Sequence, residues 1–125
     1  AGGGCVAPLE ERLKSERPRE RVGAVYELAE RGDADAVRRM IPLLVDDDEG
    51  VRFYAAVALR RATGKDFGYR AQGPLAERAR AVRSWVDWFV AEHPESKAGF
   101  EPLRETLRAM GAEPEAAERP QDDSD

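Results

Sequence analysis

The chain has one cysteine and one histidine among its 125 residues. Structural zinc sites need three or four such ligands at characteristic spacing, so Cys5 and His93 do not make one. His93 stands before Pro94 at the end of an expected helix, where an imidazole complements the helix dipole. We therefore predict no metal site, no cofactor and no catalytic residue of the cysteine–histidine or serine–histidine–aspartate kind.

Long hydrophobic runs and strand patterns are also missing. No apolar stretch approaches the roughly 18 residues of a membrane span. Glycine-rich phosphate-binding loops come directly after a β-strand in the proteins that have them. Because this chain shows no strand pattern, we predict no such loop. The acidic run 46–49 lacks the alternating carboxylates of a calcium loop and is typical of a helix N-terminus. These absences argue against an enzyme.

The net charge of −5 is concentrated at one end of the chain. Residues 1–112 carry 19 acidic and 19 basic side chains, whereas residues 113–125 carry six acids and one arginine. Within the neutral body, residues 60–83 hold seven basic and two acidic side chains. General nucleic-acid binding requires a basic footprint, which an acidic protein lacks. We expect no nucleic-acid partner, and the patch from Arg60 to Arg83 leaves an anionic ligand or nucleic acid as the alternative.

Part of the sequence recurs after 31 residues. This shift superimposes four residues on four others: Leu13, Arg21, Ala24 and Leu28 on Leu44, Arg52, Ala55 and Leu59. A period of about 20 to 50 residues is typical of helical repeats, whose units bury their apolar faces against one another. An apolar helix end, an aspartate-containing turn and the pattern Val-Arg-x-x-Ala-x-x-x-Leu cover residues 44–59. At these residues the chain resembles the HEAT-repeat family.

The resemblance implies a short all-α solenoid, with about two HEAT-like helix pairs between terminal capping helices. It also implies a non-catalytic scaffold that binds an unidentified protein partner. In such repeats an aspartate before the turn and an arginine six residues later commonly bridge adjacent units, as Asp46 and Arg52 are placed to do. The earlier unit has Arg21 but carries Ser15 instead of the aspartate, so it departs from the pattern. HEAT-like bilin lyases share the repeat and leave such an enzyme as a weaker alternative.

A second resemblance lies further along the chain. Residues 63–69 read Thr-Gly-Lys-Asp-Phe-Gly-Tyr and are followed by Glu-Arg at 77–78 and Trp-x-x-Trp-Phe at 85–89. This part is similar to short HEAT-like proteins of planctomycete-type bacteria. The resemblance implies a bacterial protein.

Apolar side chains at helical spacing predict a helical domain over residues 8–111. The expected helices cover 8–14, 18–31, 33–45, 49–63, 75–92 and 101–110. Pro42 should bend the third helix, and Leu59 and Trp85 should lie in the core. Residues 1–7 are expected to form a flexible arm and residues 112–125 a disordered acidic tail, since both lack apolar periodicity.

Residues 65–73 interrupt the repeat and contain two candidate recognition residues. Phe67 and Tyr69 flank a glycine there. Their rings either pack into the helix layer or stand exposed, since function concentrates on loops held by a rigid scaffold. Four arginines complete the partner-binding candidates: Arg60, Arg61, Arg70 and Arg78.

Cys5 is the candidate for lipidation. Bacterial lipoproteins are cleaved before a cysteine that follows small residues, and Gly4 fits this rule although Gly2 replaces the usual aliphatic residue. The hydrophobic signal itself would precede Ala1. We expect a monomer held at the bacterial cell envelope through Cys5, its only membrane contact, with a cytoplasmic protein as the alternative.

Overall fold

The computed structural model describes residues 6–111, and all regular secondary structure within this range is helical. Six segments are α-helices: α1 (Leu9–Leu13), α2 (Pro18–Arg31), α3 (Ala34–Met40), α4 (Glu49–Thr63), α5 (Leu75–Glu92) and α6 (Glu101–Ala109). Two are 3-10 helices: η2 (Ile41–Val45) and η3 (Pro94–Phe100). The all-α prediction is confirmed.

Local sequence signals set the ends of the central helices. Gly32 ends α2 with a φ of 61°, a left-handed conformation that glycine adopts without steric cost. Asp33 then caps α3, because its carboxylate accepts a hydrogen bond of 2.8 Å from the N–H of Ala36. Asp48 caps α4 in the same way through the N–H of Val51, at 3.0 Å. The acidic run thus serves as a helix N-terminus.

The type of helix changes next to Pro42. The α-helical part of this segment ends at Met40, and Ile41–Val45 continue as the 3-10 helix η2. A proline has no N–H to donate to the carbonyl four residues earlier, so the α-helical ladder cannot pass through it. The prediction of one bent α-helix over 33–45 is therefore wrong in this detail. The sequence reading also missed η3, which follows Pro94.

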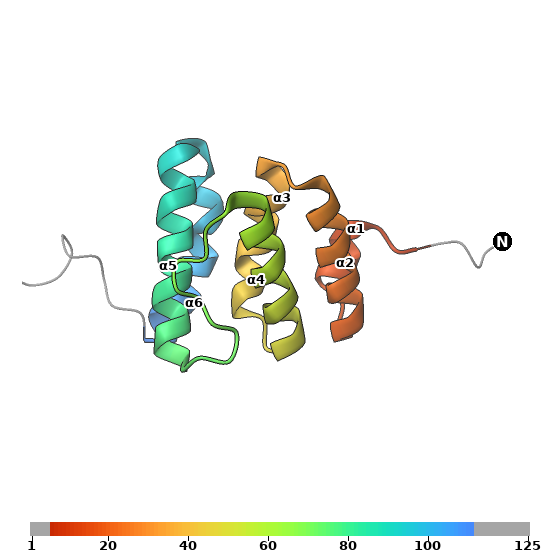
Figure 1. The fold of residues 1–125 in the computed structure, drawn as a ribbon, viewed down its shortest axis with the longest axis horizontal. Helices are drawn as coiled ribbons and strands as arrows, with labels where there is room; N and C mark the ends of the chain where they lie inside the picture. Colours follow the sequence, from red (N-terminus) through yellow and green to blue (C-terminus); the bar gives the residue numbers. More distant parts are fainter. Residues whose placement is uncertain (1–5, 112–125) are drawn as a thin grey trace, which may run out of the picture.

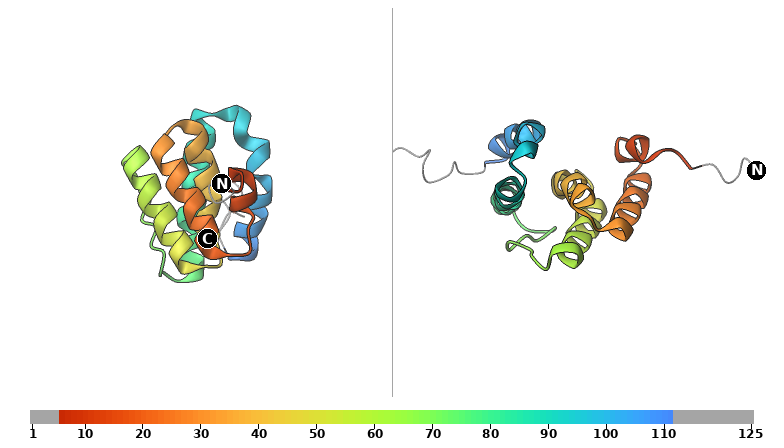
Figure 2. Two further views of the ribbon diagram at one scale, coloured as in Figure 1. Left: turned by 90° about the vertical axis from the view of Figure 1, so that its right-hand side faces the viewer. Right: turned by 90° about the horizontal axis from the view of Figure 1, so that it is seen from above.

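The helices form two layers. Seen from above, α2, α4 and α5 lie side by side in one layer, and α1, α3–η2 and η3–α6 lie in the other (Figure 2). Figure 1 shows the same order along the long axis, from α1 and α2 through α4 to α5. The packing pairs are those of a short stack: α2 contacts α4, and η2 contacts both α4 and α5. This arrangement is a short all-α solenoid.

The core runs along the interface between the layers. Six of its largest fully buried side chains come from the central elements α2, α3, η2, α4 and α5: Leu28, Met40, Ile41, Leu44, Leu59 and Trp85. The predicted core positions Leu59 and Trp85 are confirmed. Leu75, by contrast, is 51% exposed at the start of α5, although the apolar pattern had included it.

The connection between α4 and α5 runs back along the length of the helices. In Figure 1, α4 ends at the top, the loop descends, and α5 begins at the bottom. The two helices therefore run in the same direction, with residues 64–74 in place of a returning helix. This loop fills the space with aromatic side chains, since the rings of Phe67 and Trp85 lie 4.8 Å apart in an edge-to-face contact.

Candidate functional site

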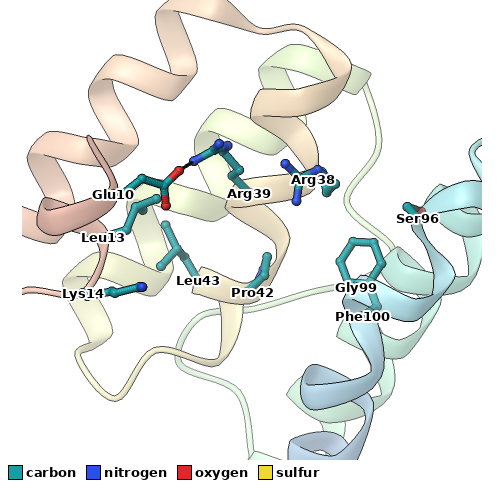
Figure 3. A pocket seen from close by; sticks show the side chains of 10 residues that line it. All are labelled: Glu10, Leu13, Lys14, Arg38, Arg39, Pro42, Leu43, Ser96, Gly99 and Phe100. Atoms are coloured by element: carbon teal, nitrogen blue, oxygen red, sulfur yellow. Dashed lines mark hydrogen bonds and ion pairs between the residues drawn. The ribbon is translucent and has the colours of Figure 1, made fainter. Parts of the chain in front are cut away.

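A pocket of about 360 Å³ lies on the layer that contains α1, α3–η2 and η3. Ten residues from these elements line it: Glu10, Leu13, Lys14, Arg38, Arg39, Pro42, Leu43, Ser96, Gly99 and Phe100 (Figure 3). A second pocket of about 430 Å³ shares Arg38, Ser96 and Gly99 with it and extends to Phe89 and His93. The two pockets adjoin, and we call them together the inner groove.

The inner groove has an apolar floor and a charged rim. Leu13, Pro42, Leu43 and Phe100 supply the apolar surface of the first pocket. The 3-10 form of η2 contributes to this floor, because it presents both Pro42 and Leu43 to the pocket. Concave sites of this kind, mostly apolar with a few polar groups, are typical of ligand and peptide binding.

An ion-pair network holds the cationic rim in place. Arg39 donates hydrogen bonds to Glu10 of α1 and, at 3.1 Å, to Asp35 of α3. Arg31 and Arg38 also donate to the Asp35 carboxylate, and these hydrogen bonds hold the pKa of Asp35 well below its usual range. Asp35 therefore stays ionised and orients Arg38 at all physiological pH values.

Lys14 is the rim cation without such a partner. Its amino group makes no hydrogen bond or ion pair within residues 6–111. With Arg38 and Arg39 it outnumbers Glu10 among the residues that line the first pocket. This end of the inner groove is thus cationic, whereas the second pocket adds the carboxylates Asp35 and Glu95.

The predicted repeat residues form a clasp between units, in which Arg21 of one unit pairs with Asp46 of the next. Arg21 donates from Nε and Nη2 to the two carboxylate oxygens of Asp46, at 2.8 and 2.9 Å. Both side chains are nearly buried, with 11% and 8% exposed. Arg21 also donates to the carbonyl of Ser15 at 2.6 Å, and the pair with Asp46 raises the pKa of Arg21. The unit that lacked its own aspartate therefore uses the aspartate of the next unit.

Arg52 contacts backbone carbonyls rather than the Asp46 carboxylate. It donates to the backbone carbonyl of Asp46 at 2.9 Å and to that of Ala71 at 3.1 Å. Each arginine thus donates to the carbonyl six residues before it and to a group in the following part of the chain. The same shift of 31 residues carries Arg52 onto Arg83 of α5, a position that the sequence reading missed.

The structure separates the two loop aromatics. Tyr69 is 8% exposed and donates a hydrogen bond of 2.6 Å to the carbonyl of Leu44, so its ring is packed and unavailable at the surface. Of the two alternatives for Tyr69, the packed one is correct. Phe67 is half-buried against Trp85 and Trp88, and its role as a recognition residue stays a prediction.

The four candidate arginines do not gather in one place. Arg60 and Arg61 are exposed in the last turn of α4, which ends at the top of Figure 1, whereas Arg78 lies in the first turn of α5, which begins at the bottom. Arg78 is half-buried and donates to the carbonyl of Gly73 at 3.0 Å, which fixes the loop. Arg70 is exposed between them on the loop. The charge excess of residues 60–83 is therefore divided between opposite ends of the neighbouring helices α4 and α5.

A cluster of exposed apolar side chains was missed by the sequence reading. It contains Tyr26 of α2 and Phe53, Tyr54 and Val57 of α4, which are 55, 53, 40 and 37% exposed. The Tyr54 ring lies 5.5 Å from both the Tyr26 and the Phe53 ring, in edge-to-face contacts. We call these four residues the outer aromatic face. The sequence contained a sign of this cluster, because α4 has large apolar residues at positions outside its buried apolar stripe.

Other site types find no support among the residues described. Between residues 6 and 111, no three His, Cys, Asp or Glu side chains gather in a group that could hold a metal ion. No helix in that range is both long and apolar enough to cross a membrane. Cys5 and the acidic segment 112–125 lie outside the described residues.

Comparisons with known proteins agree with the repeat. A family model described as HEAT repeats matches residues 6–89, about two thirds of the chain. The match includes the clasp, the outer aromatic face and most of the inner groove. No curated protein and no solved structure matches the chain. The family match covers more than half of the chain, and the structure is a helical stack whose units are joined by Arg21 and Asp46. The chain therefore belongs to the HEAT-repeat family.

Proposed function

We propose that this protein is a scaffold that binds a segment of a protein partner in the inner groove. HEAT repeats generally mediate protein–protein interactions. The observation that carries the proposal is the groove itself, because three separate elements, α1, η2 and η3, surround one apolar floor. A peptide laid across η2 would contact all three.

The chemistry of the groove favours a segment that combines an apolar side chain with a carboxylate. The apolar side chain fits over Pro42, Leu43 and Phe100, which line the floor. The carboxylate fits beside Lys14 and Arg38 at the cationic end, where Lys14 has no partner of its own within residues 6–111. Charge-assisted hydrogen bonds at such a rim set orientation and specificity more than affinity.

A groove-filling substitution tests the proposal. A Cβ added at Gly99 would meet no heavy atom within 4 Å, so a larger side chain can be accommodated there without strain and would occupy the groove. We expect Gly99→Tyr to abolish the capture of a specific partner from the native host while leaving the melting temperature nearly unchanged. Ala98→Tyr is the matched control, because Ala98 is exposed on η3 and does not line either pocket.

Lys14→Glu provides a second, independent measurement. It reverses one rim charge without touching the apolar floor, and binding of the captured partner should weaken and lose part of its salt dependence. A partner whose capture is unchanged by both Gly99→Tyr and Lys14→Glu would place binding elsewhere on the molecule.

We further propose that the protein is tethered to the bacterial envelope through lipidation of Cys5. The supporting observation is the sequence alone, in which the sole cysteine follows three small residues. Stable anchoring needs more than one acyl chain, and lipoprotein processing supplies several. When the protein is expressed with its full upstream sequence, it should fractionate with membranes and Cys5→Ser should not. An unmodified intact mass in the soluble fraction would exclude the tether.

A further inference from the structure

We propose that the outer aromatic face is a second docking surface, for a protein segment that carries apolar anchor residues next to carboxylates. The surface consists of Tyr26, Phe53, Tyr54 and Val57 with Arg60 and Arg61 beside them at the end of α4. It belongs to the layer of α2 and α4, on the other side of the molecule from α1 and η3 (Figure 2). It is therefore independent of the inner groove.

The exposed apolar residues have no structural role that explains them. Phe53 and Tyr26 each leave more than half of their side chain in solvent, and α4 already buries a separate stripe of Val51, Ala55 and Leu59. Single exposed apolar residues are ordinary, but contiguous ones mark interaction sites. The edge-to-face contacts of Tyr54 with Tyr26 and Phe53 make these three residues contiguous across two helices.

The composition of the surface fits a protein partner. Protein interfaces are enriched in tyrosine, phenylalanine and arginine and depleted in lysine, glutamate and aspartate. Tyrosine supplies a large rigid contact area with a polar hydroxyl at its tip. The Tyr26 hydroxyl interacts with Tyr54, which raises the pKa of Tyr26, so the Tyr26 phenol remains a neutral donor at physiological pH.

Charge complementarity selects the kind of segment. Arg60 and Arg61 are exposed, and neither guanidinium makes an ion pair or hydrogen bond within residues 6–111. The two arginines lie together in the last turn of α4 and leave a local positive excess there. They follow Phe53 and Val57 at helical spacing, one turn further along α4. A partner would thus place its apolar side chains over Phe53 and Val57 and its carboxylates over the arginines.

The geometry of the rings favours a peptide over single-stranded nucleic acid. Bases bind to open ring faces, on which successive bases stack. Here the rings meet at 69° and 75°, so the edge of one ring faces its neighbour and no flat platform is formed. Two arginines on an acidic protein also supply little of the phosphate neutralisation that nucleic-acid binding needs.

A selection from random peptides displayed on phage tests the proposal on the full-length chain. We expect the enriched peptides to combine aromatic or aliphatic residues with aspartate or glutamate. Their binding should weaken about tenfold or more with Phe53→Ser, and also with the double substitution Arg60→Glu and Arg61→Glu. The charge reversal should in addition remove the salt dependence of binding. All three side chains are exposed, so both variants should keep the wild-type circular dichroism spectrum and melting temperature.

Two matched controls locate the binding site. Arg70→Glu reverses an exposed charge on the loop, and Gly99→Tyr fills the inner groove; neither should change the affinity of these peptides. Failure to enrich acidic peptides, or enriched peptides that bind the Phe53→Ser and arginine variants as well as the wild type, would overturn the proposal. So would self-association in sedimentation that Phe53→Ser abolishes, because a second copy of the chain would then occupy the face. Binding of oligothymidine that depends on Phe53 would overturn it in favour of nucleic acid.

Discussion

At the scale of single residues, the clasp between units depends on two buried charges. Arg21 and Asp46 are bound through two parallel hydrogen bonds and are shielded from water. Such a pair adds little net stability when complete, but removal of one partner leaves a buried charge uncompensated. Ordinary surface pairs such as Arg31 with Asp35 do not have this property.

The first prediction compares three arginines. Arg21→Ala should lower the free energy of unfolding by about 3–5 kcal/mol, as measured by urea denaturation. Arg31→Ala, the exposed control, should leave the free energy of unfolding nearly unchanged. Arg52→Ala should fall between them at about 1–3 kcal/mol, because it leaves only backbone carbonyls without a donor. Equal losses for Arg21→Ala and Arg31→Ala would show that the clasp does not join the units.

The second prediction concerns Tyr69 in alkaline solution. Burial raises the pKa of Tyr69 to about 12, above the value of about 10 for an exposed tyrosine. The folded protein therefore binds more protons than the unfolded chain between about pH 10 and pH 12, so this contribution to stability is complete below pH 10 and is lost as the pH rises through that window. Tyr69→Phe should be less stable than the wild type at neutral pH by about 1–3 kcal/mol, since the hydrogen bond to the Leu44 carbonyl is lost.

The measurement is urea denaturation of both proteins at several pH values. The difference in unfolding free energy should shrink between about pH 10 and pH 12, because only the wild type has this buried phenol to ionise. A difference that stays constant with pH would mean that Tyr69 titrates like an exposed tyrosine.

At the scale of elements, the loop between α4 and α5 stores backbone strain. Phe67 has a φ of 54°, in the left-handed region that costs a residue with a Cβ about 1–2 kcal/mol. Its ring compensates by packing against Trp85 at 4.8 Å and Trp88 at 6.2 Å. At this residue the packing of the ring stabilises the fold, whereas the left-handed backbone conformation destabilises it.

The third prediction separates these two effects. Phe67→Ala removes the ring but keeps the strain, whereas Phe67→Gly removes both. We expect both variants to be destabilised and the glycine variant to be the more stable by about 1 kcal/mol, the reverse of the usual order in a helix. Thermal denaturation of the two variants decides the matter, and a more stable alanine variant would show that the left-handed conformation is not retained.

At the scale of the whole molecule, the charge distribution is set by the end of the sequence. Residues 113–125 carry the entire net charge, and residues 60–83 carry a local positive excess. The exposed arginines of that region lie at opposite ends of α4 and α5 and on the loop between them rather than in one patch. We expect the acidic segment to act on them through long-range attraction that salt screens.

The fourth prediction is that truncation after Ala112 increases polyanion binding. The truncated chain has a formal net charge of zero instead of −5. Its retention on heparin should rise at low ionic strength and return to the wild-type value at about 1 M salt, where the Debye length is about 3 Å. Combining the truncation with Arg60→Glu and Arg61→Glu should cancel the gain. Identical retention of the full and truncated chains at low salt would show that the acidic segment does not screen the arginines.

The sequence by itself determined most of the α-helices, the ends of the central ones and the buried stripe. Asp33, Asp48, Gly32 and Gly64 act through hydrogen bonds and dihedral angles within a few residues, so their effect can be read locally. The repeat of 31 residues and the helical spacing of apolar side chains likewise identify the family and core positions such as Leu59.

Only the tertiary structure decided which groups meet across elements. Arg21 and Asp46 are 25 residues apart and pair because α2 packs beside α4, which spacing within one repeat could not reveal. The inner groove exists because η3, which the sequence reading missed, comes to lie opposite α1 across η2. The outer aromatic face and the dispersal of the basic residues follow from which side of each helix is covered. That choice is made by the packing of neighbouring helices, since the hydrophobic effect has no direction of its own.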